Sequence, residues 1–242
     1  MAMTKPTASL PRYFWRTAPH SCPYLAGRVE RNVFTEIGGK DGHAGYDALV
    51  RHGFRRSQRI VYRPDCPSCS ACVPVRVVAD GFVPSRSLRR VLAENRDMDA
   101  TESPAVATLE QFRLFGRYAL ERHDGGEMAA MTFHDYRRMI EDSPVETAVV
   151  EFRSTGGALA AACLMDRVSE GLSAVYSFYD PALAARSLGT YMVLWLIYRA
   201  RADRLPYVYL GYWIAQSRKM SYKTRFRPLE AFGPDGWRLL VL

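Results

Sequence analysis

The stretch "VETAVVEFRSTGGALAAACLMDRVSEGLSAVYSFYDP" (145–181) decides the fold, because it holds three strand patterns separated by two short turns. Runs rich in β-branched, aromatic and small apolar residues lie at 145–153, 158–168 and 172–179, and glycine-containing turns such as "STGG" are typical of hairpins. Asp180-Pro181 ends the third run, since proline cannot continue a sheet ladder. The sequence therefore predicts a three-stranded antiparallel meander.

The segment after the meander predicts a helix and then a fourth strand. An apolar helical pattern runs from about 187 to 203 and stops before Pro206, and "YVYLGYW" (207–213) follows as a short aromatic strand. A helix between two strands of one sheet implies a right-handed crossover. The last strand is therefore expected to lie parallel to its neighbour.

Two amphipathic helices are expected before the meander. "TLEQFRLFGRYALERH" (108–123) starts with Thr108 and Gln111 in a capping-box pattern, and "TFHDYRRMIEDS" (132–143) starts with a similar Thr-x-x-Asp pattern. The element order α-α-β-β-β-α-β is that of the N-acetyltransferase (GNAT) fold. We therefore predict an α+β, GNAT-like mixed sheet flanked by helices.

The division of the chain is predicted from a polar segment. Residues 95–108, "NRDMDATESPAVAT", have the composition of a linker. This places a smaller, basic, cysteine-containing N-terminal domain at 1–100 and the acyltransferase-like domain at 101–242.

Composition is that of a soluble globular protein, with 48% hydrophobic and 24% charged residues in 242. The N-terminal sequence has no apolar core of signal-peptide length, and the longest apolar run, "YMVLWLIY" (191–198), is too short to cross a bilayer. Five cysteines without a secretion signal favour reduced thiols. We therefore expect a cytoplasmic protein with no membrane partner.

The positive charge is unevenly distributed. Residues 1–100 carry 16 Lys and Arg against 9 Asp and Glu, whereas residues 101–242 carry 17 against 16. Five arginines lie within 51–63, and five basic residues lie within 218–227, a stretch without an acidic residue. Such clusters suit a polyanion such as nucleic acid, although composition alone is equally consistent with solvated basic surfaces.

The start of the long helix bears on the acyl donor. In the GNAT fold a turn of the form R-x-x-G-x-G/A cradles the pyrophosphate of coenzyme A at this helix N-terminus. The matching "RSLGTY" has Arg186 and Gly189 but places Tyr191 at the second small position, where a ring would obstruct a phosphate. We therefore expect no coenzyme A. Gly189 could equally serve helix packing.

Longer motifs carry a family resemblance that spans about residues 12 to 232. They are "CPYLAGR", "GFRRSQRIVYRPDCPSCSACVPVRV", "FVPSRS", "YSFYDP", "SLGTY", "YVYLGYWI" and "KMSYKTRFRPLE". Together they resemble the arginyl-tRNA–protein transferase family, and most closely its bacterial branch. The resemblance implies an aminoacyltransferase that moves leucine from leucyl-tRNA to proteins beginning with Asp or Glu, marking them for degradation by the N-end rule.

Alternatives remain open at this point. The same chemistry could transfer arginine from arginyl-tRNA. A coenzyme A-dependent N-acyltransferase and a non-enzymatic RNA-binding protein are two further readings. Aminoacyl-tRNA is the only obligate co-substrate that the resemblance implies.

The reaction implied by the resemblance needs little activation, because an aminoacyl ester is already reactive. Positioning, one proton acceptor and a hydrogen-bond donor to the oxyanion suffice. Asp180, just beyond a strand end, is the candidate proton acceptor, and Tyr176 or Tyr179 is the candidate oxyanion donor. Asp180 could instead start an Asp-Pro turn, and the tyrosines could belong to the core.

Two sets of binding residues are expected. The candidates for tRNA and its aminoacyl end are Arg186, Gly189, Tyr212, Lys219, Tyr222 and Lys223, since aromatic rings stack on bases and lysines meet phosphates. The candidates for the acidic side chain of the acceptor are Arg55, Arg56 and Arg86, since guanidinium pairs bidentately with carboxylate. These arginines could equally contact tRNA.

The stretch "CPSCSACVP" (66–74) raises the question of a metal. Cys66, Cys69 and Cys72, joined by Cys22, would form a four-thiolate set suited to zinc or an iron–sulfur cluster. Eukaryotic relatives carry a paired-cysteine motif near the N-terminus, which here reads Cys22-Pro-Tyr-Leu25 and lacks its second cysteine. We expect the four cysteines to lie close together. Metal ligation and partly buried thiols are equally consistent with the pattern.

Overall fold

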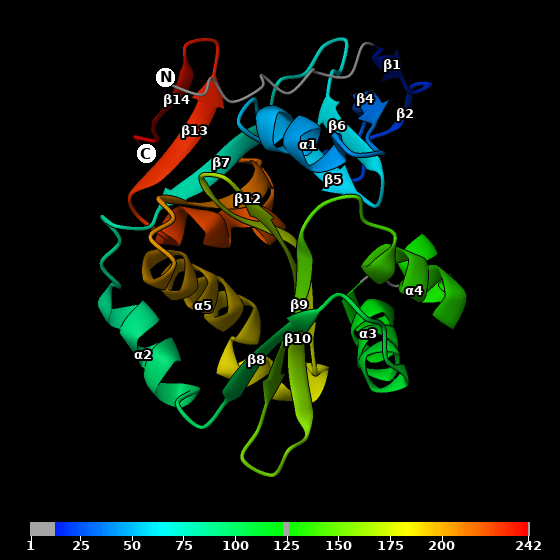
Figure 1. The fold of residues 1–242 in the computed structure, drawn as a ribbon. Coiled ribbons are helices and arrows are strands. Elements are labelled where there is room, and N and C mark those ends of the chain that lie inside the picture. Colours follow the sequence, from blue (N-terminus) through cyan, green and yellow to red (C-terminus); the bar gives the residue numbers. More distant parts are fainter. Residues whose placement is uncertain (1–12, 123–125, 242) are drawn as a thin grey trace, which may run out of the picture.

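A computed structural model describes residues 13–122 and 126–241, and its main feature is an eight-stranded mixed sheet (Figure 1). The strands follow one another across the sheet in the order β14-β13-β7-β12-β11-β10-β9-β8. Their bounds are β7 Val73–Val78, β8 Asp99–Pro104, β9 Thr147–Arg153, β10 Leu159–Val168, β11 Gly171–Tyr179, β12 Tyr207–Trp213, β13 Leu229–Gly233 and β14 Gly236–Leu239. The expected mixed sheet flanked by helices is therefore present.

The meander and the crossover have the predicted pairing. β9, β10 and β11 are joined antiparallel, and α5 (Leu188–Ala202) leads from β11 to β12, which pairs parallel with it. The short helix η2 (Pro181–Arg186) lies between β11 and α5, where the Asp180-Pro181 signal ended the strand. The local patterns of 145–213 are thus confirmed.

Helices cover both faces of the sheet and enclose two apolar cores. α3 (Leu109–Arg122) and α4 (Phe133–Glu141) lie on one side, and α5 with α2 (Arg86–Glu94) lies on the other (Figure 1). Side chains alternate along β10, so Cys163 packs in the core between the sheet and α5, and Leu164 packs in the core between the sheet and α3. Both expected capping boxes form; Thr108 and Gln111 each accept a hydrogen bond from the other's backbone N–H.

The linker expected at 95–108 is wrong in part. Residues 99–104 form β8, which pairs antiparallel with β9 at the edge of the sheet. An edge strand can stay polar, and its composition then resembles that of a loop. The sheet also takes β7 from the first hundred residues and places it between β13 and β12. The division at residue 100 stays a prediction.

A smaller N-terminal sheet stands at the upper edge of the large one (Figure 1). It has the order β1-β4-β6-β5 and is accompanied by α1 (Gly42–Val50) and a β2–β3 hairpin. The strand bounds are β1 Trp15–Arg16, β2 His20–Ser21, β3 Val29–Glu30, β4 Asn32–Glu36, β5 Arg55–Ser57 and β6 Ile60–Pro64. Tyr46 of α1 is fully buried in a third core that also contains Tyr209 of β12, so the two sheets are packed together.

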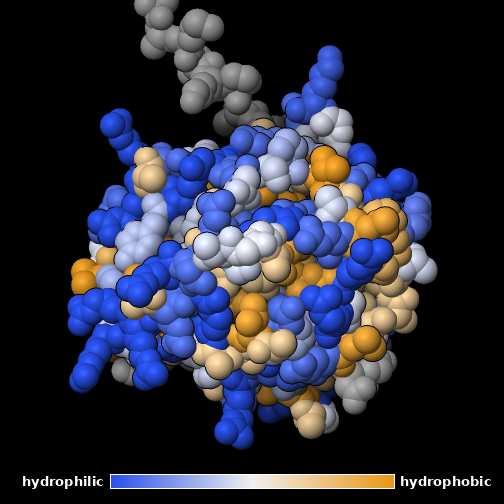
Figure 2. Space-filling model, turned by 90° about the horizontal axis from the view of Figure 1, so that it is seen from below, coloured by the Kyte–Doolittle hydropathy of each residue, from blue (hydrophilic) through white to orange (hydrophobic). Residues whose placement is uncertain are grey.

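The remaining short helices are η1 (Glu127–Ala130) and η3 (Arg218–Arg225), and η3 follows the end of β12. Seen from below, the surface bears mostly hydrophilic side chains, with hydrophobic residues showing near the centre (Figure 2). Among the helices of the described ranges, none is long and apolar enough to cross a membrane.

Candidate functional site

The parallel strands β11 and β12 part soon after they meet. Their pairing joins residues 171–173 to 207–209, and beyond it the guanidinium of Arg55 donates to the carbonyl oxygens of Ala174 (3.1 Å) and Val175 (2.9 Å). Arg55 crosses Gly211, which has a φ of +73° and where any Cβ would collide with the guanidinium. A side chain therefore replaces the missing ladder contacts and keeps the strands apart.

A cavity of about 490 Å³, here called the strand-split cavity, opens where these strands part. β11, the start of α5, η3 and one face of α3 contribute to its walls. Its apolar wall consists of Ala174, Met192, Val193, Leu196 and Leu210. Its aromatic wall consists of Tyr24, Tyr118, Tyr176, Tyr179 and Tyr222. The cavity thus combines an apolar surface with several hydroxyl groups.

A second cavity of about 690 Å³, the cysteine-side cavity, lies against the first. The two share Tyr24, Arg55 and Met220 as a common wall. Arg28 and Arg63 add positive charge to the cysteine-side cavity, and the carboxylates of Glu30 and Asp65 also line it. Arg55 is thus placed between two chambers.

Tyr176 and Tyr179 lie where an oxyanion donor was expected. The Tyr176 hydroxyl is buried in the wall of the strand-split cavity and has no hydrogen-bond partner in the described part of the chain. Burial raises the pKa of Tyr176 well above its ordinary value, so the hydroxyl keeps its proton. Tyr179 packs edge-on against Tyr118, with ring centroids 5.0 Å apart. The Tyr176 hydroxyl therefore has a proton that it could donate to a ligand.

Asp180 has other contacts than those expected of a base. One carboxylate oxygen accepts from the backbone N–H of Ala182 (3.0 Å) at the start of η2, and the other accepts from Arg117 (3.0 Å). Asp180 is not among the described residues that line the strand-split cavity. These contacts match the alternative of a turn starter, and its catalytic role stays a prediction.

The basic segment after β12 contributes directly to the strand-split cavity. Lys219, Tyr222 and Lys223 of η3 all line it. Lys223 is only 5% exposed, and its Nζ donates to the carbonyl of Tyr212. Burial, reinforced by the charge of Arg55, lowers the pKa of Lys223 to about 7.

Tyr212 lies elsewhere than its neighbours in sequence. It is buried on the cysteine-side cavity, and its hydroxyl donates to the carbonyl oxygens of Tyr62 (3.0 Å) and Gly53 (3.2 Å). Tyr212 therefore joins β12 to the N-terminal sheet. Its ring is not in the strand-split cavity with Tyr222.

Of the two helix-start candidates, Gly189 lines the strand-split cavity and Arg186 does not. The guanidinium of Arg186 donates to the Asn95 side chain and to the carbonyl of Glu94, and it forms an ion pair with Asp97. Arg186 therefore fastens the end of α2 to η2. The ring of Tyr191 packs edge-on against Phe152, at 5.7 Å between centroids.

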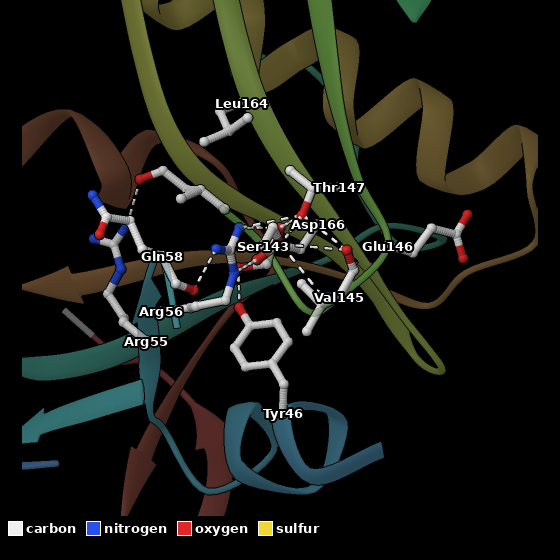
Figure 3. Close-up of polar contacts among 12 residues, drawn as sticks. Tyr46, Arg55, Arg56, Gln58, Ser143, Val145, Glu146, Thr147, Leu164 and Asp166 are labelled. Carbon is white, nitrogen blue, oxygen red and sulfur yellow. Dashed lines mark hydrogen bonds and ion pairs between the residues drawn. The ribbon is translucent and has the colours of Figure 1, made fainter. Parts of the chain in front are cut away.

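The three acceptor candidates lie in different environments. Arg55 and Arg56 are consecutive in β5 and so point to opposite faces (Figure 3). Arg56 is wrong as an acceptor contact, because its fully buried side chain forms a bidentate ion pair with Asp166 (2.6 and 2.8 Å). Arg86 is exposed at the start of α2 and lines neither cavity. Arg55 alone of the three reaches the strand-split cavity.

The four cysteines gather around the cysteine-side cavity. All of Cys22, Cys66, Cys69 and Cys72 line it, and burial together with the other three thiols raises the pKa of Cys72 to about 12. Cys66 Sγ instead contacts the carbonyl of Arg31 at 3.7 Å. Within residues 13–122 and 126–241, no group of His, Cys, Asp or Glu is arranged to hold a metal ion. The thiols as they stand do not fit zinc or an iron–sulfur cluster.

Sequence reasoning missed the contribution of α3 to the site. Tyr118 and Arg122 are four residues apart, and both line the strand-split cavity. This spacing places two side chains on one helical face beside the apolar stripe. The signal was present in the sequence, but only the packing of α3 against β11 shows what that face meets.

Two family models match the chain in sequence. The model described as arginine-tRNA-protein transferase, N terminus, matches residues 20–90, and the C-terminus model matches residues 110–233. Among solved structures, that of L-PGS from Bacillus licheniformis is 13% identical and covers 75% of this chain and 54% of its own, with a TM-score of 0.46. A likeness of this size does not assign a fold.

Full-length relatives are much more similar. An aspartate/glutamate leucyltransferase from Paramagnetospirillum magneticum is 60% identical over 94% of this chain and 93% of its own. One from Gluconacetobacter diazotrophicus is 52% identical over 97% of this chain and 90% of its own. The resemblance seen in the motifs is thereby confirmed, and the chain belongs to the arginine-tRNA-protein transferase family, alongside the aspartate/glutamate leucyltransferases.

Proposed function

We propose that this protein transfers leucine from leucyl-tRNA to the N-terminal α-amine of proteins that begin with Asp or Glu. The observation that carries the proposal is 60% identity, over nearly the whole length, to an enzyme of that name. Leucine at such an N-terminus would mark the acceptor for degradation by the N-end rule. We further propose that the fold is GNAT-like, because β11 and β12 meet in parallel, part, and open a cavity beside the start of α5.

The strand-split cavity favours leucine over arginine as the transferred residue. Its apolar wall of Ala174, Met192, Val193, Leu196 and Leu210 suits a branched aliphatic side chain. A buried guanidinium would need a carboxylate partner, and none of the described lining residues is Asp or Glu. An arginyl group would therefore lose hydration without regaining an ion pair.

Tyr176 suits the chemistry of an ester under attack by an amine. As the α-amine nitrogen bonds to the carbonyl carbon, the carbonyl oxygen becomes an oxyanion that needs a positioned donor. The Tyr176 hydroxyl is protonated, buried and unpartnered within the described residues. Collapse of the intermediate then breaks the ester bond to the ribose oxygen and leaves an amide.

Arg55 is the residue best placed to read the acidic side chain of the acceptor. It lies between the two cavities and pairs with no carboxylate in the described ranges, although two backbone carbonyls fix its position. A held guanidinium can bind a carboxylate bidentately. The acceptor's Asp or Glu side chain would thus lie in the cysteine-side cavity and its α-amine in the strand-split cavity.

The tRNA would bind over η3 and α2. A contact of 3.5 Å between Arg225 and Ser87 joins these elements, and several of their cations form no ion pair within the described residues. These cations are Arg86, Arg89, Arg90, Arg218, Lys219 and Arg225, and Arg227 follows just after η3. Free guanidinium groups at a surface suit phosphates, so affinity should fall steeply with salt. Arg86 would then contact tRNA rather than the acceptor.

One assay tests the proposal. Purified protein is mixed with labelled leucyl-tRNA or arginyl-tRNA and with peptides that differ only in a first residue of Asp, Glu, Asn, Gln or Ala. We expect leucine to be transferred to the Asp and Glu peptides, with much slower transfer to the amides and to Ala. Preference for arginyl-tRNA would overturn the donor, and equal rates with Ala would overturn the acid-specific pocket.

A further inference from the structure

Lys223 is a buried cation without an anion. It is 5% exposed, and its Nζ donates to one neutral acceptor, the carbonyl of Tyr212. In the described part of the chain it forms no ion pair, and the positive charge of Arg55 adds to burial in lowering its pKa. Burying an ammonium group in this way opposes its charged form. Lys223 is therefore held in conditions that favour a neutral amine.

The other polar groups that line the strand-split cavity are cations, hydroxyl groups and one thiol. Its cations are Arg55, Arg122 and Lys219, and its hydroxyl and thiol groups are those of Tyr24, Tyr118, Tyr176, Tyr179, Tyr222 and Cys163. Burial raises the pKa of Cys163 to about 12 and raises the pKa of Tyr118, Tyr176 and Tyr222 as well. None of the described lining residues is Asp, Glu or His.

We propose that Lys223 is the catalytic base, which accepts the proton that the acceptor's α-amine releases as it attacks the leucyl ester. The inference rests on the proposed function and deepens it. The new bond joins the α-nitrogen to the carbonyl carbon, and the bond from that carbon to the ribose oxygen breaks. The proton passes from the α-nitrogen to Lys223 Nζ and then to the leaving ribose oxygen, which returns Nζ to its neutral form.

Geometry supports Lys223 over Asp180 in this role. Lys223 and Tyr176 both line this cavity, and the unpartnered hydroxyl of Tyr176 is buried in its wall. Both carboxylate oxygens of Asp180 have partners outside it, on Ala182 and Arg117. A pKa of about 7 for Lys223 also leaves a large neutral fraction at the pH where the α-amine, with a pKa of about 7.7–8.0, becomes nucleophilic.

The test measures single-turnover transfer to an Asp-initiated peptide at saturating leucyl-tRNA. Lys223→Met should lower the rate by about 10²–10⁴-fold. Lys223→Arg should be nearly as slow, because it keeps the charge and the donor to Tyr212 but cannot give up its proton. Lys40→Met, which changes an exposed lysine, is the matched control and should leave the rate unchanged.

The pH profile and chemical rescue separate a base from a structural contact. The wild-type rate should rise with pH through about 7, as Nζ loses its proton, and the variants should keep only the inflection of the acceptor amine. Methylamine or ethylamine added to Lys223→Ala should restore transfer in proportion to its concentration.

Two results, each obtained with active wild-type enzyme, would overturn the role of Lys223. One is an active Lys223→Arg variant. The other is a Lys223→Ala variant that binds tRNA normally but is not rescued by added amine. Inactive wild-type enzyme would instead overturn the proposed function. Thermal melting identifies a variant that fails to fold. If Lys223→Met or Lys223→Ala does not fold, the Lys223→Arg rate and the wild-type pH profile decide whether Lys223 is the base.

Discussion

Two buried basic residues of this protein, Arg56 and Lys223, differ in their surroundings, because Arg56 is paired with a carboxylate and Lys223 is not. Arg56 is enclosed with Asp166, donates also to the carbonyl of Gln58, and has Thr147 beside it (Figure 3). Lys223 has one neutral acceptor and a second cation nearby. Complete pairing is typical of a structural site, whereas an unpaired charge at a cavity is typical of a chemical one.

The Arg56 region connects the two halves of the protein. Arg56 comes from β5 of the small sheet, and Asp166 comes from β10 of the large one. Tyr46 adds a further contact, since its hydroxyl donates to Ser173 at 3.1 Å. Substitutions in this region should therefore lower the free energy of unfolding more than the transfer rate. Substitutions at the strand-split cavity should lower the transfer rate more than the free energy of unfolding.

The largest expected effect is that of Asp166→Ala, which leaves Arg56 buried without its partner. Removing one member of a buried pair lowers stability by about 3–5 kcal/mol, which urea unfolding would measure. Glu36→Ala is the control, because its pair with Arg59 is exposed and should contribute less than about 1 kcal/mol. Equal losses in the two variants would remove the distinction between the regions.

Tyr176→Phe should have the next largest effect, on the transfer rate rather than on stability. It removes a hydroxyl that has no partner among the described residues, so folding should be unaffected, whereas loss of an oxyanion donor lowers single-turnover rate by about 10²–10³-fold. Tyr136→Phe gives the opposite pattern, since its hydroxyl donates to Gln111 and contributes about 1 kcal/mol to stability. An unchanged rate in Tyr176→Phe would assign the oxyanion to another donor.

Arg55→Lys should change which acceptors react. Loss of bidentate pairing is expected to reduce the preference for Asp over Asn peptides by about 10–100-fold, as a charge-assisted hydrogen bond contributes about 1.5–3 kcal/mol. Competition between the two peptides at fixed leucyl-tRNA measures the ratio. If the ratio stays at its wild-type value, the acceptor's carboxylate is bound elsewhere.

Asp180→Asn should have the smallest effect. Asparagine caps a helix as well as aspartate does, and the lost pair with Arg117 is partly exposed and contributes less than about 1 kcal/mol. With Lys223 as the base, the single-turnover rate should stay within a few-fold of wild type. A loss of about 10²–10⁴-fold would indicate that Asp180, and not Lys223, accepts the proton.

The elements that could be predicted from the sequence are those specified by local signals. The meander, its crossover helix and both capping boxes depend on residues a few positions apart, so periodicity and turn chemistry were sufficient. β8 could not be found in this way, because an exposed edge strand of polar residues has the composition of a loop. The place of β7 depends on strands more than a hundred residues later.

The site was predicted in part for the same reason. Tyr176, Tyr179 and Lys223 follow from motifs near the strand ends and do meet at one cavity. Which of two adjacent arginines faces it could not be predicted, because alternation separates Arg55 from Arg56 without saying which side is the interior of the protein. The partner of Arg56, Asp166, is 110 positions away.

The crossing of Arg55 over Gly211 has a consequence for how such a sequence can diverge. Glycine at 211 leaves the space through which the guanidinium passes to reach β11, and no other residue leaves it. A side chain at 211 would expel Arg55, whereas the φ of +73° favours glycine at 211 whether or not Arg55 is present. Position 55 therefore depends on position 211, 156 residues away, more than 211 depends on 55. Relatives that have arginine at 55 should also have glycine at 211, whereas relatives that have lost the arginine should often keep the glycine.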